Sequence, residues 1–276
     1  MIRLIPRDRV STGQVVLSSV VAVAATLVTG ALIFALLGYQ PGEALYHFFI
    51  SPFGRVDRVG DLLVKACPLI IISLGLIFCY RANAWNIGAE GQFILGAMAA
   101  GWLALSFPDT TSPLLLPAMM LTAMLAGAVW AGIAAALRAH FNANEILVTL
   151  MLTYIASLLL DFVVRGPLRD PKSFGFPLTK MYPDAGLIDR MPLPFIGQIG
   201  QLHSGVLLAL VLVPVIWFVL QRSLPGYQIT VAGLAPRAAR FAGFSDRLII
   251  YGVLAASGAM AGLAGMVEVS ANIGQL

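Results

Sequence analysis

The chain has 276 residues, of which 59% are hydrophobic and only 11% are charged. Soluble domains carry about 25% charged residues, so this composition excludes an ordinary water-soluble fold and favours a protein that lies in a bilayer. The net charge of +4 does not indicate a nucleic-acid-binding surface, because the arginines are scattered without accompanying aromatic residues. Basic residues in membrane proteins more often set topology.

Several apolar stretches approach the roughly 20 residues that a helix needs to cross about 30 Å of hydrocarbon. We therefore expect an all-α fold, a polytopic transmembrane helical bundle of about seven spans in a single domain covering residues 1–276. The first run is too long for a signal peptide, which predicts an uncleaved span. The chain stops directly after the last span, so we expect it to be truncated at its carboxyl end. In chain order the expected spans are Val15–Gly38, Leu62–Tyr80, Gln92–Phe107, Leu114–Leu137, Ile146–Val164, Ser204–Leu220 and Leu248–Val267.

Lysine and arginine placement favours a cytoplasmic amino terminus. This orientation places one set of arginines inside: Arg3, Arg7, Arg9, Arg81, Arg138, Arg222, Arg237, Arg240 and Arg247. Most basic residues on the other side fall in residues 165–201, a long segment where charge guides topology less reliably. Its prolines exclude a regular helix, and its apolar residues predict packing on the protein or on lipid headgroups.

Residues 83–92 read NAWNIGAEGQ and separate two short apolar runs. Gly88 and Gly91 permit non-helical backbone, and polar side chains at 86, 90 and 92 are costly against lipid. One interpretation is a broken helix beside a polar pathway, since irregular backbone at membrane depth is tolerated only against protein or water. The alternative is a surface loop with the acidic side chain solvated or paired with Arg81.

Other polar residues in or near the spans have simpler interpretations. Lys65 and Asp161 lie near span ends, where a long basic side chain reaches the interface, although ionisable groups in spans are always functional candidates. Asn142, Asn144 and Glu145 are expected to cap the next helix. Three small residues in the last span, Gly258, Gly262 and Gly265, predict close helix packing.

The segment LPGYQITVAGLAPRAARFAGFSD (224–246) follows a span and predicts a short amphipathic helix at the cytoplasmic surface. A basic lipid anchor is one explanation. Docking to a soluble partner is favoured because Gly226, Gly233 and Gly243 suggest turns that an anchor does not need. No nucleophile–base arrangement, P-loop or dinucleotide fingerprint is present, and the histidines and cysteines show no metal-ligand spacing. Nothing in the sequence supports a membrane enzyme.

Three motifs in the same order resemble permease subunits of ATP-binding-cassette (ABC) importers of the simple-sugar and nucleoside type. WNIGAEGQF (85–93) resembles the family's FNIGAEGQ, and NEILVTLMLTYIA (144–156) resembles NEVVTTLMLNYIA. GYQITVAGLAPRAARFAG (226–243) resembles its cytoplasmic coupling segment, with Thr230 and Ala235 where arginine and asparagine are common. Ribose-type and branched-chain amino-acid permeases are similar but less close.

The resemblance implies a multi-pass transport protein of the bacterial inner (plasma) membrane that is not itself an enzyme. It implies an ATPase partner that binds ATP and magnesium, a second permease subunit and an extracytoplasmic solute-binding protein. This chain would bind no cofactor or metal. The coupling segment would be residues 221–247, with contacts from Gly226, Tyr227, Pro236, Arg237, Arg240 and Gly243. The substrate path would involve Asn86, Glu90 and Gln92. The main alternative is a self-contained secondary transporter or channel, which would require paired intramembrane charges and inverted repeats.

Overall fold

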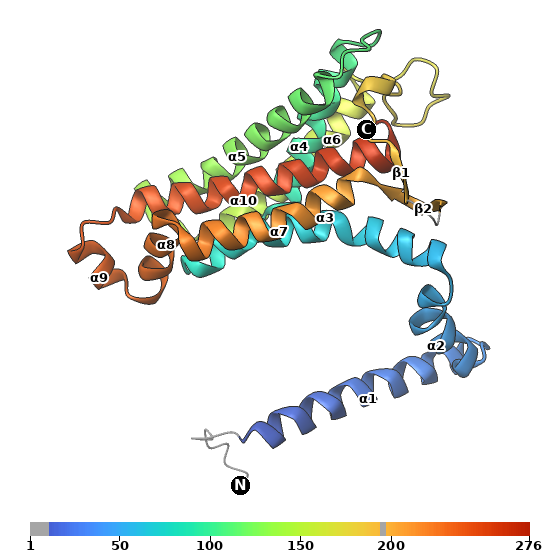
Figure 1. The fold of residues 1–276 in the computed structure, drawn as a ribbon, viewed down its shortest axis with the longest axis horizontal. Coiled ribbons are helices and arrows are strands. Elements are labelled where there is room, and N and C mark those ends of the chain that lie inside the picture. Colours follow the sequence, from blue (N-terminus) through green and yellow to red (C-terminus); the bar gives the residue numbers. More distant parts are fainter. Residues whose placement is uncertain (1–10, 194–196) are drawn as a thin grey trace. The chain divides into compact units, whose positions relative to one another are not determined.

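A computed structural model of the chain describes residues 11–193 and 197–276, and nearly all of its regular structure is helical (Figure 1). Arg3, Arg7 and Arg9, which entered the topology argument, lie outside the described residues. The chain divides into two compact units, Met1–Val59 and Gly60–Leu276. Each is described by itself.

The first unit contains α1 (Thr12–Leu36), α2 (Pro41–Phe49) and the short 3₁₀ helix η1 (Ser51–Phe53). Ser11 begins α1 with a capping box, since its hydroxyl accepts from the Gln14 amide while the Gln14 side chain returns to the Ser11 amide. No residue of α1 is buried. Its apolar side chains therefore suit contact with lipid or with another subunit.

The second unit holds the remaining helices and a small antiparallel sheet. Its spans follow the apolar runs of the sequence closely, because a helix in lipid satisfies every backbone polar group within itself. The elements are α3 (Val56–Arg81, beginning at the end of the first unit), α4 (Ala89–Ser106), α5 (Leu115–Phe141), α6 (Glu145–Arg165), η2 (Asp184–Gly186), β1 (Arg190–Leu193), β2 (Gly197–His203), α7 (Ser204–Arg222), α8 (Leu224–Leu234), α9 (Pro236–Phe241), α10 (Asp246–Glu268) and the π-helical turn η3 (Val269–Ile273).

Among the described residues, six helices are long and apolar enough to cross a bilayer, against the expected count of about seven. The difference is α4, which forms as expected but has only 18 residues. Glu90 and Gln92 in its first turn and its internal glycines lower its hydropathy. α4 is nonetheless central, because it packs against α5, α6 and α10.

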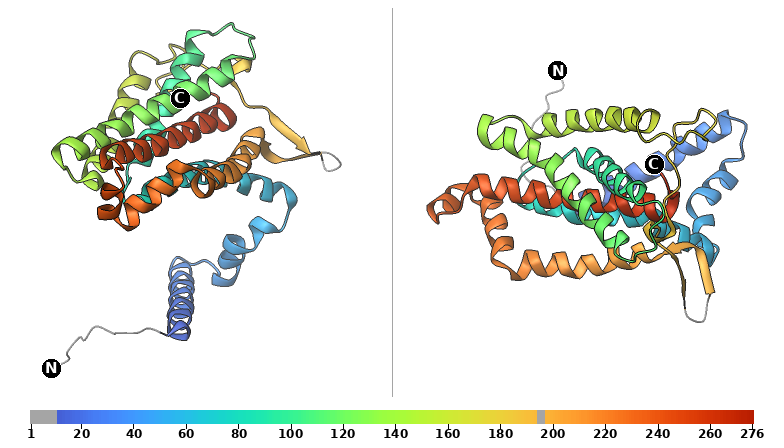
Figure 2. Two further views of the ribbon diagram at one scale, coloured as in Figure 1. Left: turned by 60° about the vertical axis from the view of Figure 1, so that its left-hand side comes forward. Right: turned by 90° about the horizontal axis from the view of Figure 1, so that it is seen from above.

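Small residues in α10 allow its backbone to lie in close contact with the backbones of the neighbouring helices. A Cβ on Gly258 would overlap the Gly127 carbonyl of α5, and one on Gly265 would overlap the Phe93 carbonyl of α4. Gly262 meets Ala123 in the same way. Figure 2 shows α10 in red between α5 and α7. The predicted packing role of Gly258, Gly262 and Gly265 is therefore confirmed.

The helices of the second unit bring distant loops together at two ends. Residues 82–88, 142–144 and 223–245 share one end, here called the Arg81 end, where Glu145 contacts Trp85 and Gly233 contacts Arg81. Residues 107–114, 166–193, 197–203 and 269–276 share the other, here called the hairpin end after strands β1 and β2. Arg81 and the later arginines that the sequence analysis placed on the cytoplasmic side all lie at the Arg81 end.

In residues 166–193 and 197–203, the part of this segment that the structure describes, there is no regular α-helix, as predicted, and the segment packs on the bundle. The Thr179 amide donates to the Leu276 carbonyl at 3.1 Å, and the Thr179 hydroxyl accepts from the Leu276 amide at 2.9 Å. Tyr182 donates its amide hydrogen to the Gly274 carbonyl at 2.8 Å. The Ile188 amide donates to the Ser270 carbonyl at 2.9 Å. This long segment therefore forms an ordered cover over the end of α10.

Candidate functional site

The amide side chains of the NAWNIGAEGQ segment form a buried cluster. Asn86 and Gln92 are 1% and 2% exposed, and their amides bond reciprocally at 2.8 and 3.0 Å. Asn86 also donates to the Ser257 hydroxyl of α10 at 2.9 Å and accepts from the Gly88 amide at 3.1 Å. Both side chains thus hold the non-helical turn before α4 against α10, at a depth where unpaired amides would be costly.

The turn is held on its other side by the start of α6. Asn144 caps α6 as predicted, accepting from the Ile146 amide, whereas Asn142 ends α5 in the left-handed conformation with φ of 53°. Glu145 pairs with Arg138 at 2.5 Å and accepts a long bond from the Trp85 amide at 3.4 Å. The Ile87 amide donates to Thr149 at 3.2 Å. The segment is therefore fixed by α5, α6 and α10 together.

The expectation that Gly88 and Gly91 both break the helix is corrected by the structure. Gly88 precedes α4, but its φ of −95° does not require glycine, and Gly91 lies within the helix. Both positions require glycine because the backbone of α6 packs directly against them. A Cβ on Gly88 would lie 2.5 Å from the Thr149 carbonyl oxygen, and one on Gly91 would lie 2.8 Å from the Thr153 Cα. The glycines serve close packing rather than backbone freedom.

Glu90 differs from its two amide neighbours because its side chain is exposed. Among the described residues, no ion pair joins it to Arg81. Of the three residues predicted to line a path, Glu90 alone has a side chain free to meet a solute in this state. The other two reach a solute only if their mutual bonds open.

The predicted single amphipathic helix is wrong in detail, because residues 224–241 form two helices, α8 and α9. They meet at Ala235, which lies outside both helices, and Pro236 begins α9. Proline has no backbone N–H to donate within a continuing helix, and it suits the first turn of a helix. Figure 1 shows the two short helices at the Arg81 end of the bundle.

The glycines of this segment also differ from expectation. Gly226 and Gly233 lie inside α8 rather than at turns, and a Cβ on either would overlap neighbouring carbonyl oxygens. For Gly226 these belong to Val219 and Leu220 of α7, and for Gly233 to Arg81 of α3. Only Gly243 makes a turn, with φ of 81° after α9.

The outer face of α8 and α9 carries exposed side chains of two kinds. Arg237 and Arg240 are exposed, and Arg240 lies 3.6 Å from Asp246. Leu234 and Phe241 are 82% and 97% exposed. The Tyr227 ring, itself mostly exposed, packs edge-on against Phe244. Such a mixture of basic and large apolar side chains is characteristic of a protein-binding surface.

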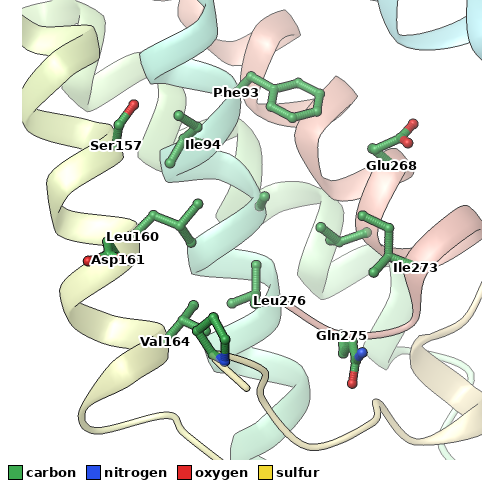
Figure 3. A pocket seen from close by; sticks show the side chains of 13 residues that line it. Phe93, Ile94, Ser157, Leu160, Asp161, Val164, Glu268, Ile273, Gln275 and Leu276 are labelled. Atoms are coloured by element: carbon green, nitrogen blue, oxygen red, sulfur yellow. The ribbon is translucent and has the colours of Figure 1, made fainter. Parts of the chain in front are cut away.

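A carboxyl group that the sequence interpretation passed over lies at the hairpin end. Glu268, near the end of α10, accepts from the Asn272 amide at 2.9 Å and lines a cavity of about 430 Å³. Figure 3 shows it across the cavity from Ser157, Leu160 and Asp161 of α6. The signal was available, because a lone acidic residue within an apolar run marks a candidate site. By contrast, Lys65 is exposed, and Asp161 pairs with Arg165 at 2.6 Å.

Within the part of the chain that the structure describes, no group of three or more histidine, cysteine, aspartate or glutamate side chains is arranged to hold a metal ion. Cys67 and Cys79 are buried and donate to the carbonyls of Gly205 and Val253, each at 3.3 Å. Both thiols therefore have structural contacts between helices.

Comparison with known proteins identifies the family. The profile of the branched-chain amino acid transport system permease component matches residues 58–274. A glucose ABC transporter permease of Haloferax volcanii is 33% identical over 99% of this chain and 73% of its own length. A guanosine ABC transporter permease of Bacillus subtilis is 32% identical over 90% and 70%. A nucleoside ABC transporter permease of Lactococcus lactis is 28% identical over 91% and 70%. No solved structure matches.

The chain therefore belongs to the permease-component family of branched-chain amino acid transport systems, and it is a multi-pass membrane subunit of an ABC transporter. The matched region coincides almost completely with the second structural unit. Both regions that the sequence analysis singled out, around residues 83–92 and 224–246, lie within it.

Proposed function

We propose that this chain is the transmembrane subunit of an importer that moves a simple sugar or a nucleoside across the bacterial cell membrane. ATP hydrolysis, with its magnesium ion, takes place in a partner subunit. A second permease, either another copy or a different chain, completes the pathway, and an external binding protein delivers the solute. The relatives named for glucose, guanosine and nucleosides, which align over most of this chain, support this solute class.

The observation that carries the proposal is the surface of α8 and α9. Arg237, Arg240 and Phe241 project from a short helix outside the spans, while Gly233 presses the preceding helix against Arg81. One side of this segment is exposed, and the other side packs directly against the spans. Such an arrangement suits docking of a soluble ATPase. The Arg81 end then faces the cytoplasm, in agreement with the positive-inside rule.

The docked segment lies next to the proposed substrate path. Arg81, which contacts Gly233, directly precedes the turn that contains Asn86 and leads into the start of α4, where Glu90 and Gln92 lie. A movement of α8 would act on this turn directly, because no other helix or strand lies between them in the contact. In this arrangement Glu90 forms part of an inner gate, and the two amides meet the solute when their reciprocal bonds open during the switch between two states.

The first test is co-purification of the permease from native membranes with and without Arg237→Ala and Arg240→Ala. The expected result is recovery of an ATPase subunit by the unmodified protein and its loss from the double variant. The matched control is Lys172→Ala with Lys180→Ala, which removes the same charge from exposed positions at the hairpin end. Recovery of no ATPase, even by the unmodified chain, would favour a self-contained transporter.

The second test reconstitutes the assembly and measures uptake of glucose and guanosine, with leucine as a competitor. Leucine is included because the family takes its name from branched-chain amino acids. Uptake that requires ATP and resists leucine supports the proposed solute class. Strong inhibition by leucine would move the assignment to an amino-acid permease. Unchanged uptake kinetics in Glu90→Gln and Asn86→Ala would assign the NAWNIGAEGQ segment a structural role only.

A further inference from the structure

Two cavities adjoin at the hairpin end of the second unit. The first, of about 300 Å³, lies between the end of α4 and the segment that follows α6. The second, of about 400 Å³, is lined by residues of α4, α5 and α6. Pro167 and Leu168 line both cavities. The two spaces therefore meet along these residues, and their chemistry differs.

The first cavity is basic. Arg169 and Lys180 line it, and no carboxylate among the residues that the structure describes does so. A backbone bridge between Arg169 and Thr179 holds the two chain segments together. Both basic side chains are exposed, and neither forms an ion pair within the described chain. The neighbouring Asp170 carboxylate accepts from the Lys172 amide at 3.0 Å instead. This cavity therefore suits an anionic group.

The second cavity is an apolar groove along α4. Its described lining residues are all apolar, and they include Leu95, Met98 and Trp102 of α4 and Val163 of α6. From Leu95 to Trp102 the helix rises about 10 Å. Trp102 is 60% exposed and lies one turn before the end of α4. Tryptophan is enriched at the membrane–water interface. The groove therefore runs from the bilayer surface into the hydrocarbon region.

An anionic phospholipid has both required parts in this order. Its phosphate lies at the bilayer surface, where arginine binds phosphate through paired hydrogen bonds and lysine as a point charge. Its acyl chain extends into the hydrocarbon, in line with the groove. A zwitterionic lipid also brings a positive group, which two unpaired cations disfavour. An apolar helix of a partner subunit would fill the groove but leave both cations unmatched.

We propose that Arg169 and Lys180 bind the phosphate of an anionic phospholipid whose acyl chain lies in the groove beside Trp102. This site goes beyond the proposed function and does not depend on which solute is carried. The bound lipid contacts α4, α5 and α6 and so supports their packing at the hairpin end. Because α8 and α9 lie at the opposite end of the bundle, loss of the lipid is not expected to release the ATPase.

Trp102 can report occupancy, because bromine atoms on an acyl chain quench the fluorescence of a nearby indole ring. The assembled importer in detergent micelles is titrated with brominated phosphatidylglycerol and, separately, with brominated phosphatidylcholine. Trp102→Phe gives the background from the other tryptophans. Half-maximal quenching is expected at a several-fold lower content of phosphatidylglycerol. Equal quenching by both lipids overturns the anionic preference. Absence of Trp102 quenching by either lipid, as expected if a partner helix fills the groove, overturns the site.

Substitution of the two cations tests their role in the same titration. Both side chains are exposed, so Arg169→Gln with Lys180→Gln should keep the fold. Each basic residue beside an anionic headgroup strengthens binding about fivefold, and phosphatidylglycerol should bind the double variant roughly 25-fold more weakly. Lys172→Gln with Arg190→Gln is the matched control, because it removes the same charge from exposed positions outside both cavities. Equal weakening in both double variants overturns the inference.

Phospholipid retained from the native membrane provides an independent measurement. Native mass spectrometry of the purified importer should find anionic phospholipid on the unmodified protein and on the Lys172 and Arg190 control. The variant that lacks both Arg169 and Lys180 should retain several-fold less. Equal retention by all three proteins overturns the inference, even where the fluorescence titration shows a preference.

Discussion

Asn86 and Gln92 close a ring of hydrogen bonds, because each side-chain amide donates to the other, at 2.8 and 3.0 Å. Six positions separate them, and the non-helical turn between them is what allows the two amides to face each other. Since Asn86 also bonds to Ser257 of α10, the ring joins the start of α4 to the helix with the most buried residues in the described bundle.

The amide ring predicts strong coupling between its members. Asn86→Ala leaves the buried Gln92 amide without its two partners, and Gln92→Ala removes two of the hydrogen bonds of Asn86. Each is expected to lower the free energy of unfolding by about 1–3 kcal/mol. The double variant should lose much less than the sum, because the second substitution removes a group already unpaired. Thermal unfolding in detergent measures the cycle. Gln221→Ala, an exposed position on α7, is the control, and additive losses would contradict the paired arrangement.

The contact of Gly233 with Arg81 predicts that α8 tolerates no side chain there. Gly233→Ala places a methyl group against the Arg81 carbonyl oxygen and must move α8 away from α3. Overpacking of this kind costs about 1–3 kcal/mol, and we expect ATP-driven uptake to fall more steeply than protein yield. Gly252→Ala, at a helical glycine with open space around it, should leave both unchanged. Normal uptake by the Gly233 variant would exclude this contact from the coupling route.

The exposed ring of Phe241 predicts an energetic anchor for the partner. Phe241→Ala removes a side chain that is 97% exposed in the single chain, so the fold should keep its stability. Buried aromatic anchors at interfaces contribute about 2 kcal/mol or more, and recovery of the ATPase subunit should fall at least tenfold. Phe174→Ala removes a ring that is 99% exposed at the hairpin end and should have no effect. Equal losses from both variants would indicate nonspecific association.

The sequence was sufficient for most of the helices and insufficient for the contacts between them. Apolar length alone placed α5, α6, α7 and α10 within a few residues, since lipid requires each span to satisfy its own backbone. The break between α8 and α9 was visible in principle, because Pro236 cannot continue a helix. The roles of Gly91 and Gly233 were not visible, because they are explained by Thr153 and Arg81, which are distant in sequence.

The candidate sites show the same limit. The polar character of NAWNIGAEGQ was evident, yet its division into a buried ring and an exposed Glu90 depends on Ser257, which is 171 residues from Asn86. The cavity beside Glu268 was missed because α4, α6 and the end of α10 bound it, and only the folded chain brings these elements together. A lone Glu268 within an apolar helix was the one available signal.

The buried histidine of the hairpin end predicts a dependence of stability on pH. Burial lowers the pKa of His203, and Glu268 partly opposes this shift. The unfolded chain takes up a proton near the ordinary pKa of about 6.5, whereas the folded protein resists it. The free energy of unfolding should therefore be at its full value above pH 6.5 and fall as the pH drops toward the lowered pKa.

His203→Asn retains an acceptor for the Gly205 amide but does not titrate, so it should lose less stability between pH 7 and pH 5. Thermal unfolding of both proteins across this range, with His47→Asn at an exposed position of α2 as control, makes the comparison. Parallel pH profiles for the unmodified protein and His203→Asn would show that another group governs acid sensitivity.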